Sequence, residues 1–192
     1  MLIQILANAS LFEFLLQVDG DIANTAKSKG CAHCNGPLDA APFPRKPRGG
    51  PPELKEDVLL RFSFCCREDG CRRRLTPPST RFFGASVYFS AVIILVGAMM
   101  GDMSSASYSK LSAAYGIDRR TLKRWRVLFG ATLPSKPGWS LIAARFMPPL
   151  DASNYLLSML NRFAIDVSDV AHDALSQLLI FIYPLSQKKQ EA

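Results

Sequence analysis

The chain has 192 residues, of which 48% are hydrophobic and 20% are charged, and its formal net charge is +7. This hydrophobic content can fill a core, so the composition excludes a wholly disordered protein, and the length allows one domain or two small ones. The positive charge indicates a polyanionic partner, by default nucleic acid. It is concentrated in three clusters, at residues 45–48, 72–74 and 119–126.

The sequence contains five cysteines, an odd number. No basic residue precedes the apolar residues at the N-terminus, so we expect no secretory signal peptide. Cysteines in a cytosolic protein indicate metal ligation rather than disulfides. We therefore expect a cytoplasmic protein whose cysteines bind a metal ion.

Residues 2–18 carry a broad apolar stripe, which is typical of a helix that buries one face in a core or a dimer. Gly20 and Asp21 are expected to end this helix. Residues 21–29 are mostly polar, and we interpret them as a linker.

Two cysteine pairs follow. Cys31 and Cys34 form a C-x-x-C knuckle, a spacing at which two thiolates can hold one tetrahedral zinc ion from a single turn. Cys66 and Cys71, with four residues between them, come after residues 58–64, whose alternating pattern predicts a strand. Residues 37–53 are rich in proline and glycine and are expected to form a loop. The two pairs predict a four-cysteine zinc ribbon.

Cys65 competes with Cys66 for one ligand position. Strand alternation weakly favours Cys65, because it places Cys66 on the face of the apolar Phe62 and Phe64. Spacing favours Cys66, which gives the tighter loop to Cys71. Strand pairing usually breaks at a metal knuckle, so we choose the spacing. The expected metal ligands are Cys31, Cys34, Cys66 and Cys71.

Three arginines follow the last cysteine directly, and guanidinium groups on a fixed turn suit phosphate contacts. They are Arg72, Arg73 and Arg74. The alternative is that one or two of them balance Glu68, Asp69 and the negative charge of a zinc tetrathiolate.

Residues 82–101 contain no charged side chain and are long enough to span a bilayer. Small residues interrupt the beginning of this segment, however, and the strongly apolar run covers only residues 87–100. That length suits a buried core helix. We expect the core helix, and a membrane-anchored protein is the alternative.

Residues 107–126 have the pattern of two short helices around a turn. Gly116 suits a left-handed helix end, and the Asp118 carboxylate can cap the second helix by accepting the N–H of Thr121. Leu122 and Trp125 lie on one face of that helix. The remaining positions are basic: Arg119, Arg120, Lys123, Arg124 and Arg126. The pattern predicts a helix-turn-helix whose second helix enters a DNA groove, and a solvated basic helix in a helical hairpin is the alternative.

Three more helices are expected, over residues 139–146, 151–163 and 169–182. The expected fold is mainly α with a small β zinc ribbon, and it comprises a helix-turn-helix and C-terminal helices. We divide the chain into an N-terminal helical segment (1–26), the zinc ribbon with its basic loop (27–83), the helix-turn-helix (84–130) and a C-terminal helical segment (131–192).

The stretches GCAHC, RFSFCCREDGCRRRLTPPSTRFFG and LSAAYGIDRRTLKRWR resemble the DNA-binding region of bacterial insertion-sequence proteins. In that family a zinc ribbon precedes a helix-turn-helix that recognises transposon ends. The resemblance covers about residues 30–126. It implies zinc ligation by the four cysteines named above and DNA contact from residues 119–126.

A transposase of the acidic-triad kind would need a further domain of strands and helices with converging carboxylates. Residues 131–192 show no such arrangement, and the chain has no glycine-rich phosphate loop. We therefore expect no enzyme activity and no small-molecule substrate, but a transposition accessory or regulatory protein that binds double-stranded DNA. A transposase or a second copy could pack on its N- or C-terminal helices. An RNA-binding zinc protein and a protein-interaction scaffold are alternatives.

Overall fold

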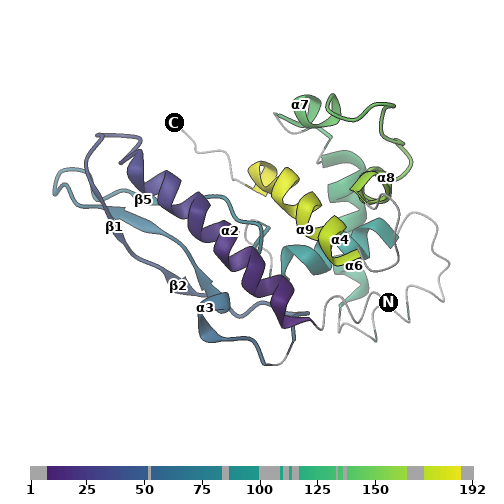
Figure 1. Ribbon diagram of the computed structural model, residues 1–192, viewed down its shortest axis with the longest axis horizontal. Helices are drawn as coiled ribbons and strands as arrows, with labels where there is room; N and C mark the ends of the chain where they lie inside the picture. The colour runs from purple at the N-terminus through teal and green to yellow at the C-terminus, as the bar shows by residue number, and fades with distance from the viewer. Residues whose placement is uncertain are drawn as a thin grey trace.

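The computed structural model describes residues 8–51, 53–83, 87–99, 117–132, 134–135, 138–163 and 171–186, together with Ser109 and Ala113. These residues form a mainly helical structure with two small antiparallel sheets. The strands lie beside the long helix α2 toward one end of the molecule, and most of the other helices gather toward the opposite end (Figure 1). The coarse fold class expected from the sequence, mainly α with a small β part, is thus confirmed.

Helix α2 (Ala9–Ser28) is longer than expected. Asn8 caps it by accepting the N–H of Ser10 at 3.0 Å. Gly20 and Asp21 do not end it, so the interpretation of residues 21–29 as a linker is wrong. One glycine costs a helix only about 1 kcal/mol, and packing of buried residues on both sides of Gly20 outweighs that cost. The buried residues are Leu11, Phe12, Leu15, Asp19 and Ala23. The expected first turns, before Asn8, lie outside the described residues.

Strands β1 (Leu38–Ala40), β4 (Phe64–Cys66) and β5 (Arg74–Leu75) form a three-stranded sheet in the order β1-β4-β5. Leu38 lies opposite Cys66, and Phe64 lies opposite Leu75. Strands β2 (Phe43–Pro44) and β3 (Leu60–Arg61) form the second sheet. Residues 37–53 therefore contain two short strands instead of a pure loop.

The single strand predicted over residues 58–64 is wrong. A helical turn, α3 (Glu56–Leu59), occupies its beginning, and β3 and β4 follow as separate short strands. The alternating pattern was misleading because the side chain of Arg61, expected on the exposed face, is itself buried. Burial here depends on partners that are distant in the sequence.

Helix α4 (Ser90–Met99) occupies the apolar run before the basic helix, and residues 91–94 and Val96 are buried. It packs against α6, α8 and α9, as expected for a core helix. None of the helices in the described part of the chain is long and apolar enough to cross a membrane.

Helix α6 (Arg119–Val127) begins where the sequence predicts, and a π-helical turn, η1 (Leu128–Thr132), follows it. Asp118 caps the helix, but its Oδ1 accepts the N–H of Arg120, at 2.7 Å, and not that of Thr121. Leu122 and Trp125 are buried, as expected. Apart from Ser109 and Ala113, the first helix predicted at 107–116 lies outside the described residues, so the helix-turn-helix stays a prediction.

The C-terminal helices are α7 (Trp139–Ala143), α8 (Tyr155–Phe163) and α9 (Ala171–Ile182), followed by the 3-10 turn η2 (Tyr183–Ser186). Helix α8 begins later than the predicted residue 151, because Asp151 accepts the N–H of Ser153 in a turn before it. One large core joins α2, α4, α6, α7, α8 and α9. A second, much smaller cluster surrounds the cysteines.

Candidate metal centre

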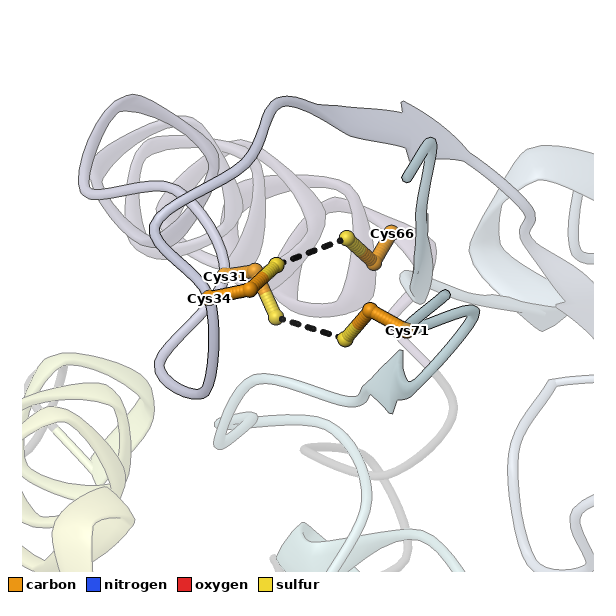
Figure 2. A group of neighbouring side chains, drawn as sticks. All are labelled: Cys31, Cys34, Cys66 and Cys71. Atoms are coloured by element: carbon orange, nitrogen blue, oxygen red, sulfur yellow. Dashed lines mark hydrogen bonds between the residues drawn. The ribbon is translucent and has the colours of Figure 1, made fainter. Parts of the chain in front are cut away.

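The first cysteine pair extends directly from the C-terminal end of α2. Gly30, which follows the helix cap, has φ +73°, and a Cβ there would lie 3.1 Å from the carbonyl oxygen of Asn35. The Cys31 N–H donates to Gly36 O at 2.9 Å, and the Asn35 N–H donates to Cys31 O at 2.8 Å. These bonds close a tight knuckle, from which the side chains of Cys31 and Cys34 both point toward Cys66 and Cys71 (Figure 2).

The second pair belongs to the sheet. Cys66 ends β4, and its N–H donates to Arg73 O at 2.9 Å. The N–H groups of Cys71 and Arg72 both donate to Glu68 O, at 2.9 and 3.0 Å. The turn between β4 and β5 therefore presents Cys71 beside Cys66, facing the knuckle (Figure 2).

The sulfur atoms of Cys31, Cys34, Cys66 and Cys71 form a compact cluster. All four Sγ atoms lie within 4.8 Å of one another, with Cys34 and Cys66 at 3.4 Å and Cys31 and Cys71 at 3.7 Å. These distances far exceed the disulfide bond length of about 2.05 Å. They approach about 3.8 Å, the edge of a tetrahedron built with Zn–S bonds of about 2.3 Å. The four cysteines thus lie close enough to bind one metal ion.

The surroundings of the four thiols differ. Cys31 and Cys66 are buried, Cys71 is half-buried and Cys34 is exposed. Backbone N–H groups of His33 and Cys34 stabilise the Cys31 thiolate and lower its pKa to about 6. Burial raises the pKa of Cys66 to about 12. At neutral pH Cys31 is therefore already a thiolate that can bind a metal ion, whereas the proton on Cys66 has to be displaced when the metal binds.

Cys65 lies outside the four-sulfur cluster. Its Sγ is 3.5 Å from Arg72 O and 3.7 Å from Cys66 O, so the thiol is directed at backbone carbonyls. The structure thus brings together the four cysteines selected by spacing. Alternation does hold in β4, where Phe64 and Cys66 are both buried, but the cysteine on this buried face is the one that joins the cluster.

The basic residues expected to contact DNA fall into two places. Arg119, Arg120, Lys123, Arg124 and Arg126 are exposed on α6, and none of them forms an ion pair within the described residues. At the cysteine cluster, Arg72 pairs with Asp69. Arg74 lies over the ring of Phe43 at 5.5 Å, and Arg72, Arg73 and Arg74 are all exposed. Figure 1 places β5 and α6 toward opposite ends of the molecule.

The sequence interpretation missed a buried polar network. Asp19 lies in α2 at helical spacing from the buried Phe12 and Leu15, a signal that could have revealed it. Arg81, its partner, has a fully buried side chain. Arg61 is also buried, and this burial lowers its pKa to about 10.

Comparison with known proteins identifies no relative: no protein-family model matches the chain, and no curated protein or solved structure matches it significantly. The resemblance to insertion-sequence proteins therefore rests on the residues of this chain alone.

Proposed function

We propose that this chain is a zinc-dependent, non-catalytic protein that binds double-stranded DNA through α6. The observation that carries the proposal is the two-sided character of α6. Its inner residues Leu122 and Trp125 are buried, and its outer face presents five exposed cations without carboxylate partners among the described residues. Guanidinium groups bind phosphates and guanine edges in two-point contacts, so such a face suits a DNA groove.

Zinc is the metal that best suits the cysteine cluster. A set of four thiolates favours zinc over magnesium or calcium, which prefer oxygen ligands. The hydrophobic cluster around the cysteines consists of Ala23, Leu38 and Phe64 with Cys31 and Cys66, and a few side chains pack at its edge. So small a core needs an additional cross-link to stay folded. Zinc bound to the four cysteines would provide one, joining the end of α2 to β4 and to the turn before β5.

The resemblance of residues 30–126 to insertion-sequence proteins favours a role in transposition, as an accessory or regulatory protein of a bacterial mobile element. In that role the protein would act in the cytoplasm beside a transposase. Arg73 is exposed, and no ion pair or ring contact holds it within the described residues, so it could add a contact to the DNA backbone.

The test is an anisotropy titration of zinc-loaded full-length protein with duplex DNA at several salt concentrations. Arg120→Ala and Lys123→Ala should each weaken binding and make the slope of log K against log salt shallower by about 1. Lys29→Ala, which removes an exposed cation at the end of α2, is the matched control and should bind as the parent does.

Parental binding by both α6 variants at every salt concentration would contradict the α6 assignment. Stronger competition by structured RNA than by duplex DNA would favour the RNA-binding alternative. Zinc dependence is tested separately by repeating the titration after chelation, which should abolish binding if the cysteine module has to be folded.

A further inference from the structure

The third basic cluster, at residues 45–48, is held in place despite its proline- and glycine-rich sequence. The Arg45 N–H donates to Leu59 O at 2.8 Å, next to the β2–β3 pairing. The Arg48 N–H donates to Val87 O at 2.8 Å, and the Phe89 N–H donates to Arg48 O at 3.3 Å. These bonds make a parallel bridge between Arg48 and Tyr88. Both ends of the cluster are therefore fixed by backbone hydrogen bonds.

Two glycines let this loop lie against helix α4 and against Phe89, the residue before it. Gly49 has φ +85°, and a Cβ on it would lie only 2.6 Å from Cγ2 of Val92. A Cβ on Gly50 would lie 2.6 Å from Cε2 of Phe89. Only residues without a side chain permit so close an approach, so the position of the loop relative to α4 is tightly defined.

Tyr88, the partner of Arg48 in this bridge, also contacts the basic helix α6. The ring of Tyr88 packs edge-on against Trp125 of α6, with ring centroids 5.2 Å apart and an angle of 89°. Tyr88 thus meets the loop through its backbone and α6 through its side chain. Lys46 and Arg48 are exposed and have no ion-pair partner within the described part of the chain.

We propose that Lys46 and Arg48 form, together with the outer face of α6, one binding surface for double-stranded DNA. In this arrangement α6 contacts the groove, and the loop contacts phosphates that flank it. This inference rests on the proposed DNA-binding function and extends it to a second element. Cations on a fixed loop lose little conformational freedom on binding, and phosphate contacts from such loops set the register of a helix in its groove.

Arg45 is not part of the proposed surface. It is half-buried, with its guanidinium 5.5 Å from the centre of the Phe82 ring, inside the junction between the sheets and the helices. The arginines at 72–74 are not included either, since they lie beside the cysteine cluster and Arg74 packs over the ring of Phe43 at 5.5 Å.

The experiment compares two double variants of the zinc-loaded full chain, Lys46→Gln/Arg48→Gln and Lys27→Gln/Lys29→Gln. Each removes two exposed cations, and the second pair lies at the C-terminal end of α2, beside the knuckle. Circular dichroism and zinc content establish that both variants are folded. Duplex DNA of mixed sequence is the probe.

The loop variant should bind DNA at least tenfold more weakly at 0.1 M salt, with a slope of log K against log salt shallower by about 2, and the control should match the parent. If the loop variant matches the control while Arg120→Ala weakens binding, the inference is overturned and the proposed function stands. If neither the loop nor the α6 variants differ from the control, both are overturned.

Discussion

Asp19 and Arg81 form a completely buried ion pair, with 2.8 Å between Nε of Arg81 and Oδ2 of Asp19. Oδ1 of Asp19 also accepts the N–H and the hydroxyl of Thr80, at 2.6 and 2.8 Å. The Nη1 and Nη2 atoms of Arg81 donate to Val58 O at 2.6 Å and to Leu60 O at 3.1 Å. The pair thereby joins α2, the α3–β3 segment and the chain leading to α4, at the junction of the cysteine module and the helical core.

Removing one member of this pair should be strongly destabilising. Asp19→Ala leaves a buried guanidinium without its counter-charge, which costs about 3–5 kcal/mol in proteins. We expect a loss of this size in the free energy of unfolding, measured by urea denaturation of the zinc-loaded protein. Asp21→Ala is the matched control, because Asp21 lies two residues further along α2 and is exposed. It should change the free energy of unfolding by less than about 0.5 kcal/mol.

The double variant Asp19→Leu/Arg81→Met gives a second measure of the pair. It leaves no isolated charge, so it should be less destabilising than Asp19→Ala. Equal stability of Asp19→Ala and Asp21→Ala would show that the pair does not hold the junction.

Substitution of the two adjacent cysteines should separate the ligand from its neighbour. Cys66→Ser removes a sulfur from the cluster and should reduce zinc content well below one ion per chain, with a lower melting temperature. Cys65→Ser removes only a thiol that faces backbone carbonyls and should retain about one zinc. Elemental analysis of protein purified without added zinc measures both. Loss of zinc from Cys65→Ser alone would reverse the assignment.

Zinc uptake should release fewer than four protons at pH 7.5. The pKa of Cys31 is lowered to about 6, so its thiolate already predominates, whereas Cys66, with its pKa raised to about 12, keeps its proton until the metal binds. As the pH falls through about 6, Cys31 takes up a proton, so zinc must displace one more and its affinity decreases. Calorimetry in two buffers of different ionisation enthalpy counts these protons. Release of four at pH 7.5 would contradict the low pKa of Cys31.

Gly49→Ala should displace the basic loop without changing its charge. The positive φ and the 2.6 Å approach to Val92 both oppose a methyl group there, and we expect a stability loss of about 1–3 kcal/mol. Gly70→Ala is the control, because a Cβ on Gly70 would meet nothing within 4 Å. Urea denaturation measures both variants. A Gly49→Ala protein as stable as the parent would show that the loop does not rest tightly on α4.

The local features of this protein could be predicted from its sequence. The spacing within each cysteine pair identified the four cysteines whose sulfur atoms cluster, because each half of such a metal site is formed by a turn of only a few residues. The beginning of α6 and the burial of Leu122 and Trp125 followed from one capping residue and helical periodicity. The uncharged run before α6 gave the core helix α4, since its apolar part is too short to span a bilayer.

The way in which these parts are joined depends on contacts that exist only in the folded chain. Helix α2 continues through Gly20 because its buried face packs on the core. The strand expected over residues 58–64 is divided because β3 pairs with β2 in one sheet and β4 pairs with β1 in the other. The Asp19–Arg81 pair and the contact from Arg48 through Tyr88 to Trp125 connect residues far apart in the chain. Local pattern cannot encode such contacts, because burial of a charge or a loop depends on which distant surface covers it.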